Sequence, residues 1–317
     1  MTDAGVLVKL DGGLGNQMFQ YALGRALSLH LGAPLTLDIG AYRSYTTRQY
    51  GLGVFDISAS TAPAAVSAGS GLTQVKTAGR SLAKLAKKIL PPAVSSLRRV
   101  GANKLELTLP SWAPPGPWTI YREPSDVAFD QALFGTQPPI YVFGYWHNER
   151  YFADYADAVR RDFTLRVALS EKARHFQQQV TERQPSVSLH VRRGDYVRNT
   201  PEARWRLDVC GVDYYRRALD FLGSKVPGPS IFVFSDEIAW VKANLKIDNA
   251  VYVDGCADYE EMFLMSCCRH HIIANSTFSW WGAWLNADKE KVVIAPKQWV
   301  NGDTSGRTPV PTGWNRL

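Results

Sequence analysis

The sequence predicts an α/β protein with two domains. Its 317 residues exceed the usual size of one hydrophobic core, so two domains are expected. The C-terminal half alternates short apolar strands with helical patterns, which is typical of a parallel sheet covered by helices. The N-terminal half begins with a strand, a glycine-rich turn, a helix and a second strand, which is a βαβ arrangement.

The composition is that of a folded protein. With 45% hydrophobic and 21% charged residues, the chain can fill two cores, and extensive disorder is not expected. No apolar run reaches the roughly 18 residues of a membrane-spanning helix, and residues 1–5 lack a basic-then-apolar signal region. We therefore expect a soluble, cytoplasmic protein. Its four cysteines lack the spacing of a disulfide framework or a zinc site.

The net charge of +7 is concentrated in one stretch of the chain. No acidic residue lies between Asp56 and Glu106, and the basic residues there are Lys76, Arg80, Lys84, Lys87, Lys88, Arg98, Arg99 and Lys104. The pattern predicts an amphipathic helix over 78–90. Residues 76–104 fit either peripheral contact with an anionic membrane or a surface helix packed on its own domain. No nucleic-acid partner is expected, because the remaining residues are nearly neutral.

The N-terminal half contains a candidate ligand-binding turn. A strand at 6–10 is interrupted at 11–17, helical spacing continues to Gly32, and residues 34–38 form a second strand. A glycine turn lets backbone amides approach a ligand, and the following helix N-terminus favours negative charge. The candidate contacts in this turn are Gly13, Gly15, Asn16 and Gln17.

This turn also resembles a dinucleotide-binding fingerprint. Asp38 follows at about the distance expected for a ribose contact. Met18 stands where the third glycine should allow the helix to pack closely on the strand. A nicotinamide-dependent oxidoreductase is therefore an alternative that the missing glycine disfavours. A membrane- or polyanion-binding module that uses the basic stretch is another alternative.

An aromatic cluster lies near the middle of the chain. A strand at 141–146 ends at Trp146 and is followed by His147 and Glu149. Aromatic faces beside polar groups suit sugars, although such clusters are also common in protein cores. Next we expect a helix over 151–161 and a charged connector over 171–184, with the boundary between the domains at 170/171.

The C-terminal half places polar residues after four strands. The expected strands are 187–191, 231–234, 251–253, 271–274 and 292–295, and the expected helices are 212–222, 238–244, 258–266 and 278–285. The polar groups are Arg192, Arg193 and Asp195; Ser235, Asp236 and Glu237; Asp254; and Asn275, Ser276 and Thr277. Parallel strands open their ligand crevice at the carboxyl ends, so these groups are expected to gather there.

Arg192 and Arg193 predict an anion site. Arginine suits phosphate because its planar guanidinium keeps its charge and matches two oxygens at once. The alternative is a surface pair that only solvates the end of a strand. Helix capping alone would likewise explain Asn275, Ser276 and Thr277.

Four motifs together resemble bacterial α-1,2-fucosyltransferases of glycosyltransferase family 11. They are GGLGNQMFQYALGRAL at 12–27, HVRRGDYV at 190–197, FVFSDE at 232–237 and ANSTFSWWGAWLN at 274–286. The resemblance implies a GT-B fold, in which two Rossmann-like domains face each other across a cleft. It also implies GDP-β-L-fucose as donor, inversion at the anomeric carbon, no required metal or other cofactor, and a galactose 2-hydroxyl as acceptor.

On this resemblance, residues 1–170 form the acceptor-side domain, with a basic insertion at about 58–104. Residues 171–317 form the GDP-sugar-binding domain, and the last residues are candidates to pack back on the first. The acceptor would be a galactoside or a lipid-linked oligosaccharide, the latter placing the protein at the inner face of the membrane. The acceptor-side candidates are Trp146, His147 and Glu149.

The same resemblance assigns Arg193 and Arg192 to the pyrophosphate of the donor, with Arg193 the more important. The other expected donor contacts are His190, Ser235, Asp236, Asn275, Ser276, Thr277 and Ser279, with Gly13, Gly15, Asn16 and Gln17 from the first domain. The general base is left open among Asp195, His190, His147 and Glu149, and Asp195 has the alternative of holding an arginine in place. Trp280, Trp281 and Trp284 are expected either as a packing face or as sugar contacts.

Overall fold

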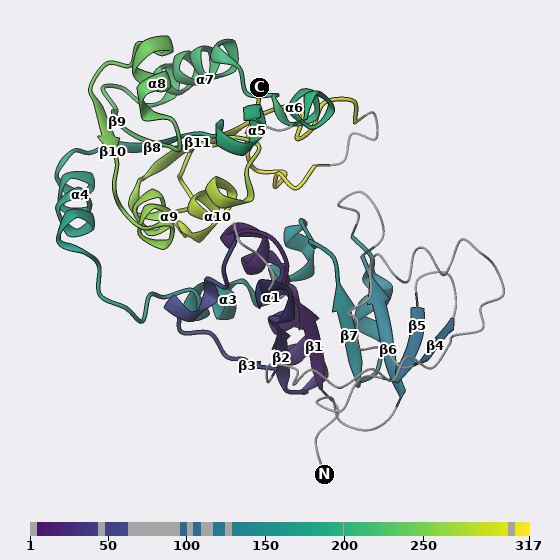
Figure 1. Ribbon diagram of the computed structural model, residues 1–317. Coiled ribbons are helices and arrows are strands. Elements are labelled where there is room, and N and C mark those ends of the chain that lie inside the picture. Colours follow the sequence, from purple (N-terminus) through teal and green to yellow (C-terminus); the bar gives the residue numbers. More distant parts are fainter. Residues whose placement is uncertain are drawn as a thin grey trace. The chain divides into compact units, whose positions relative to one another are not determined.

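The computed structural model describes residues 5–43, 48–62, 96–99, 104–108, 117–123, 129–198, 200–303 and 308–317. The chain divides into an N-terminal unit, Met1–Trp146 with Arg150–Thr164, and a C-terminal unit, His147–Glu149 with Leu165–Leu317 (Figure 1). Each unit contains its own sheet of mainly parallel strands, which confirms the predicted α/β class. The helix expected over 78–90 lies outside the described residues. Among those described, no helix is both long and apolar enough to cross a membrane.

The N-terminal sheet has seven strands in the order β3-β2-β1-β7-β6-β5-β4. The pairs from β3 to β6 are parallel, and only the two pairs that involve β5 are antiparallel. The strands are β1 (Val6–Lys9), β2 (Leu35–Asp38), β3 (Ser60–Thr61), β4 (Ser96–Arg99), β5 (Lys104–Thr108), β6 (Pro117–Arg122) and β7 (Ile140–Phe143).

Helix α1 (Leu14–Leu31) begins directly at the glycine turn and ends at Gly32 in the left-handed conformation, as the sequence predicts. The helix expected over 151–161 is shorter than predicted: α3 spans Ala156–Asp162. Consecutive Tyr151 and Phe152 are both buried, whereas neighbours in a helix point to different sides. Short 3-10 turns at Glu149–Tyr151 and Ala153–Tyr155 replace its first part. Further 3-10 turns lie at Gly40–Arg43, Leu52–Val54 and Gln131–Gly135.

The C-terminal sheet is parallel throughout, in the order β10-β9-β8-β11-β12-β13. Its strands are β8 (Ser186–Val191), β9 (Ser230–Ser235), β10 (Ala250–Val253), β11 (His270–Ile272), β12 (Val293–Ala295) and β13 (Asn315–Arg316). Its helices are α4 (Glu171–Glu182), α5 (Gly194–Arg198), α6 (Pro201–Leu207), α7 (Val212–Lys225), α8 (Ile238–Asn244), α9 (Asp258–Cys267) and α10 (Thr277–Leu285). The stretch expected as a charged connector is therefore the amphipathic helix α4.

Helices cover both faces of this sheet (Figure 1). Along β9, Ile231 and Val233 point into a core shared with α7 and α8, whereas Phe232 and Phe234 point into a core shared with α4 and α9. This alternation follows from the two-residue period of a strand. Both faces are buried, so β9 reads as a continuous apolar run.

The last residues complete the C-terminal sheet instead of leaving it. Strand β13 pairs with β12, and the Leu317 amide donates to the Ala295 carbonyl at 3.0 Å. The Trp314 ring lies 5.6 Å from that of Trp280, centroid to centroid. The last residues are therefore part of the C-terminal sheet, where pairing at its edge satisfies their backbone groups.

The contact between α9 and α10 yields a prediction about stability. A Cβ atom at Gly282 would lie 2.7 Å from Cβ of the buried Met265, so Gly282→Ala should destabilise the C-terminal unit by about 1 to 3 kcal/mol through overpacking. Gly223→Ala in α7 is the matched control. Nothing lies within 4 Å of its Cβ position, and better helix propensity should stabilise by about 0.5 to 1 kcal/mol. Urea denaturation of both variants measures the two changes, and equal changes would contradict the packing argument.

Candidate functional site

The candidate site lies where the strand order of the C-terminal sheet reverses. The chain moves from β8 to β9 and β10 on one side, then crosses to β11 and β12 on the other. The loops after β8 and β11 therefore diverge, which is the arrangement that opens a ligand crevice in α/β sheets. Arg192, Arg193 and Asp195 follow β8, and Asn275 and Ser276 follow β11.

Arg192 is held between two carboxylates. One terminal nitrogen lies 2.6 Å from Oδ1 of Asp195, and the other lies 3.2 Å from Oδ2 of Asp236, at the end of β9. The pair with Asp195 joins residues three apart around the first turn of α5. Asp195 therefore holds an arginine in this structure, which is one of the two roles that the sequence left open.

Arg193 is held differently. Its Nε donates to Glu237 at 3.1 Å, and its guanidinium carbon lies 3.8 Å from the centre of the Trp240 ring. Its backbone amide donates to Asp236 at 2.9 Å. The contacts with Glu237 and Trp240 fix the plane of the guanidinium. The bond to Glu237 uses Nε and not the two terminal nitrogens. A planar fork held in this way suits bidentate binding of an anion.

Two further features of the site depend on close packing. A Cβ at Gly194 would lie 2.4 Å from an oxygen of Asp236, so only glycine lets this carboxylate reach the loop after β8. His190 is buried, and its ring lies 5.7 Å from that of Phe278. Burial, with the charge of Arg192 second, lowers the pKa of His190 to about 3. Within the described residues its buried Nδ1 has no hydrogen-bond partner.

Most of the other polar residues at these strand ends have internal roles. Asn275 donates to the carbonyls of Leu207 and Trp299 at 2.9 and 3.0 Å. Ser276 caps α10, and Ser279 donates back to the Ser276 carbonyl. The Ser235 hydroxyl accepts from the Glu237 amide at 3.0 Å. Their side chains therefore shape the loops, and Thr277, the first residue of α10, lies beside them.

Glu261 and Trp240 belong to this region although the sequence did not point to them as site residues. Burial, followed by the charges of Asp258, Asp254 and Asp236, raises the pKa of Glu261 to about 8. Its carboxyl group therefore keeps its proton near neutral pH and can donate a hydrogen bond. The available sequence signal was the acidic spacing 254, 258, 261, together with an aromatic residue three positions after Glu237.

The glycine turn of the N-terminal unit is built by internal bonds. Gln17 is fully buried: its amide nitrogen donates to the carbonyls of Gly12 and Gln49, and its oxygen accepts from the Gly51 amide. It holds a loop in place, which differs from the expectation that it contacts the donor. Gly13 precedes α1, and Gly15 and Asn16 lie in its first turn.

Asp38 is also committed internally. It is 7% exposed, and its carboxylate accepts from the Tyr141 hydroxyl at 2.7 Å and from the Gly40 amide at 3.0 Å. This differs from the ribose-binding acid of a dinucleotide fingerprint, which must face the ligand. The missing third glycine and the buried Asp38 therefore both argue against a dinucleotide-binding site in this turn.

The aromatic candidates are core residues. Trp146 is fully buried against Tyr151, at 5.3 Å between ring centres, so the expectation that it contacts the acceptor is wrong. Its backbone amide donates to Glu123 at 2.8 Å. Trp280 and Trp281 are also fully buried and Trp284 nearly so, which confirms the packing interpretation. His147 and Glu149 lie in the short segment grouped with the C-terminal unit.

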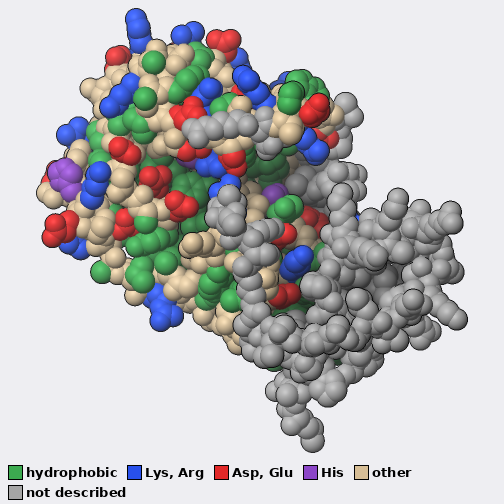
Figure 2. Space-filling model, in the orientation of Figure 1, with side chains coloured by type: hydrophobic (Ala, Val, Ile, Leu, Met, Phe, Trp, Pro, Cys, Tyr) green, Lys and Arg blue, Asp and Glu red, His purple; other side chains and the backbone are tan. Residues whose placement is uncertain are grey.

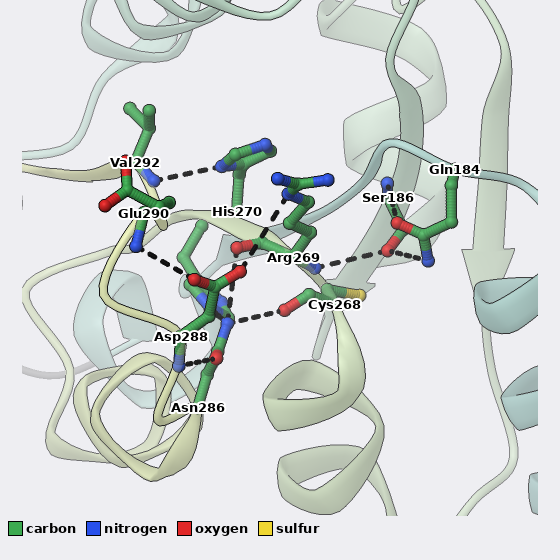
Figure 3. Close-up of polar contacts among 10 residues, drawn as sticks. Gln184, Ser186, Cys268, Arg269, His270, Asn286, Asp288, Glu290 and Val292 are labelled. Carbon is green, nitrogen blue, oxygen red and sulfur yellow. Dashed lines mark hydrogen bonds and ion pairs between the residues drawn. The ribbon is translucent and has the colours of Figure 1, made fainter.

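A second polar network lies at the opposite end of the C-terminal sheet (Figure 3). Asn286 donates to the carbonyls of Cys268 and Arg269 and contacts Nε2 of His271 at 2.9 Å, while the Val292 amide donates to Nδ1 of His270. The other nitrogen of His271 lies 2.8 Å from the Ser188 hydroxyl. These bonds fasten β8, β11 and the chain before β12, so the network serves stability.

The chain is similar to known glycosyltransferases. The arginine pair lies at the switch point of a parallel sheet, the place where its strand order reverses. The model of glycosyl transferase family 11 matches residues 83–315. The chain is 31% identical over 320 residues to an α-1,2-colitosyltransferase of Escherichia coli, covering 98% of each. It therefore belongs to glycosyl transferase family 11 and is a glycosyltransferase.

Two further similarities are more distant. Galactoside α-(1,2)-fucosyltransferase 1 of Lagothrix lagotricha is 28% identical over 212 residues, covering 62% of this chain and 56% of that protein. Among solved structures, fucosyltransferase NodZ from Bradyrhizobium gives a TM-score of 0.45 at 11% identity, covering 89% of this chain and 93% of that chain. Membership of family 11 replaces the oxidoreductase alternative and the alternative of a module that only binds membranes or polyanions.

The network around His271 predicts a pH dependence of stability. Burial, with the charges of Lys291 and His270 next, holds the pKa of His271 well below its ordinary value. Below about pH 6.5 the imidazole takes up a proton in the unfolded chain but not in the folded chain. The free energy of unfolding therefore decreases as the pH is lowered, by up to about 1.4 kcal/mol per pH unit for this group.

Urea denaturation between pH 7 and pH 5 tests this dependence. In His271→Asn the unfolded chain should bind about one proton fewer, relative to the folded chain, at the acidic end of this range. The slope of the unfolding free energy against pH should therefore decrease, whatever the effect of the substitution on stability at pH 7. His175→Gln is the control, because this histidine is exposed on α4. An unchanged slope in His271→Asn would contradict the assignment.

Proposed function

We propose that this glycosyltransferase moves L-fucose from GDP-β-L-fucose to the 2-hydroxyl of a galactose in a glycan acceptor, with inversion. The observation that carries the proposal is the Arg193 guanidinium, held by Glu237 and Trp240 at the switch point. Two relatives, one covering 98% of this chain and the other 62%, carry names that specify α-1,2 linkages, which supports the linkage.

Arg193 has a direct role in this chemistry. When the bond to the sugar breaks, negative charge grows on the departing diphosphate and must be stabilised. A guanidinium that is already oriented stabilises this charge without reorganising during the reaction. We therefore also propose that the reaction needs no metal ion, because Arg193 supplies the positive charge.

The chemistry of the site reduces the number of candidates for the general base. His190 is a poor base, since burial lowers its pKa to about 3. Asp195 accepts from Arg192 at 2.6 Å, which fits a residue that positions the arginine. Burial likewise lowers the pKa of His147, to about 4, so the same argument disfavours this histidine. We propose that the base is the remaining candidate, Glu149.

A second donor is favoured by one observation. The relative that matches 98% of this chain is named as a colitosyltransferase. L-Colitose is L-fucose without its 3-hydroxyl, so a pocket built for one sugar differs from a pocket for the other by a single polar contact. The enzyme would discriminate strongly between the two donors only if a side chain or backbone group of the site forms a hydrogen bond with the 3-hydroxyl of fucose.

The decisive experiment incubates purified protein with GDP-fucose or GDP-colitose and a panel of β-galactosides, with and without EDTA. We expect transfer of fucose, unchanged by EDTA, to form an α-1,2 linkage identified by NMR. Transfer from GDP-colitose alone would establish the second donor. Absence of transfer from both donors would refute the proposed function, and loss of activity in EDTA would refute the metal-independent step.

Arg193→Lys tests the diphosphate assignment. Lysine keeps the charge but loses the planar fork and the stacking on Trp240, so kcat/KM should fall by about 2 to 4 kcal/mol of transition-state stabilisation. Arg216→Lys is the matched control, because Arg216 forms a surface pair with Asp213 at 3.8 Å on α7. Full turnover by Arg193→Lys would remove Arg193 from the mechanism.

Asp195→Asn separates a positioning role from a base. If Asp195 positions Arg192, the variant should lose about tenfold in kcat/KM and keep the acidic limb of its pH–rate profile. A general base would instead cost about a hundredfold or more and lose that limb. Asp213→Asn, at an exposed carboxylate on α7, serves as control.

A further inference from the structure

A hollow of about 380 Å³ opens on the surface of the C-terminal unit beside α5 and α6. Its lining residues are Val197, Pro201, Arg204, Trp205 and Asp208. Figure 2 shows hydrophobic side chains at the surface over α6, with basic and acidic side chains beside them. None of the roles assigned above uses this hollow.

Trp205 is the most exposed of the large hydrophobic side chains in the described residues, at 62%. An indole is seldom left in water without a partner, so exposure of this extent marks a candidate contact surface. Arg204 and Asp208 are exposed beside it. The hollow therefore combines one flat apolar face with a cation and a carboxylate.

The chain holds this tryptophan in place. Asn301 donates to the Trp205 carbonyl at 2.6 Å, and its backbone amide donates to the Arg206 carbonyl at 2.9 Å. Gly302 follows at φ +77°, and a Cβ there would lie 2.8 Å from the Trp205 ring. A glycine at 302 thus lets the turn approach the edge of the ring, which fixes the indole while most of it stays exposed.

The hollow lies close to the candidate active site along the chain. Val197, in its lining, donates its amide to the carbonyl of Arg193 at 2.9 Å, so one turn of α5 separates the hollow from the arginine pair. At the other end of α6, the Leu207 carbonyl accepts from Asn275, at the end of β11. A ligand seated on Trp205 would therefore lie beside the residues that hold the donor.

This combination suits a sugar ring. A pyranose presents one face of C–H bonds, which packs on an aromatic ring, and a rim of hydroxyls, which pair with charged side chains. A lipid chain would gain nothing from Arg204 and Asp208, and a second phosphate group would be repelled by Asp208.

We propose that the hollow binds a sugar ring of the acceptor glycan, stacked on Trp205, with its hydroxyls bonded to Arg204 and Asp208. This inference rests on the proposed function and adds acceptor recognition by the C-terminal unit. The sequence had placed acceptor recognition in the N-terminal half. Trp205 would then set acceptor specificity without taking part in donor binding.

The experiment compares wild type, Trp205→Ala and Trp205→Phe, with Leu29→Ala on α1 as the control at another exposed apolar side chain. Saturation-transfer NMR with lactose measures sugar binding, and calorimetry with GDP measures donor-site integrity. Trp205→Ala should weaken lactose binding and raise the acceptor KM by about tenfold, with GDP binding unchanged. Trp205→Phe should recover most of the loss, because an aromatic face remains.

Equal lactose binding and equal acceptor KM in wild type and Trp205→Ala would overturn the proposal. The proposal would also be overturned if light scattering showed that wild type is a dimer and Trp205→Ala a monomer, with lactose binding unchanged. The NMR measurement needs no turnover, so it separates this inference from the proposed function. A protein that transfers no fucose but loses lactose binding in Trp205→Ala keeps the hollow as a sugar site.

Discussion

Two adjacent positive charges at the end of one buried strand are the constraint around which the C-terminal unit is organised. Arg192 and Arg193 repel each other, and each needs a compensating carboxylate close by. Asp195 and Asp236 take Arg192 from two sides, and Glu237 takes Arg193. The two arginines are therefore held differently: Arg192 has both terminal nitrogens paired with carboxylates, whereas Arg193 pairs through Nε and stacks on Trp240.

The rest of the switch point supports this arrangement. The Tyr196 hydroxyl on α5 donates to the Asn275 carbonyl at 3.0 Å, so the loops after β8 and β11 are tied together. Asn275 in turn holds the end of α6, and α6 carries Trp205. Hydrogen bonds thus connect the loop that carries the arginine pair, through Asn275, to the helix that carries the exposed tryptophan.

In the N-terminal unit, two buried glutamine side chains connect loops and strand ends through hydrogen bonds to the backbone. Gln20 accepts from the Asp11 amide and donates to the Gly144 carbonyl, which joins the ends of β1 and β7. Gln17 holds the loop that follows β2. Because the side chains of Gln17 and Gln20 are used internally, they contribute to the shape of the turn, and its backbone lies at the N-terminus of α1.

The sequence by itself determined the α/β class, most strands and helices of the C-terminal sheet, and the family. Helix α8 spans the predicted residues, and the βαβ start was foreseen with its glycine cap, because hydrophobic period and caps are local properties. Motifs located the arginine pair for the same reason. Tertiary structure alone decided which carboxylate holds which arginine, that Trp146 is buried and that Trp205 is exposed. Those outcomes depend on contacts between residues far apart in the chain, such as Asn301 and Trp205. Local sequence patterns carry no information about which distant residues come into contact.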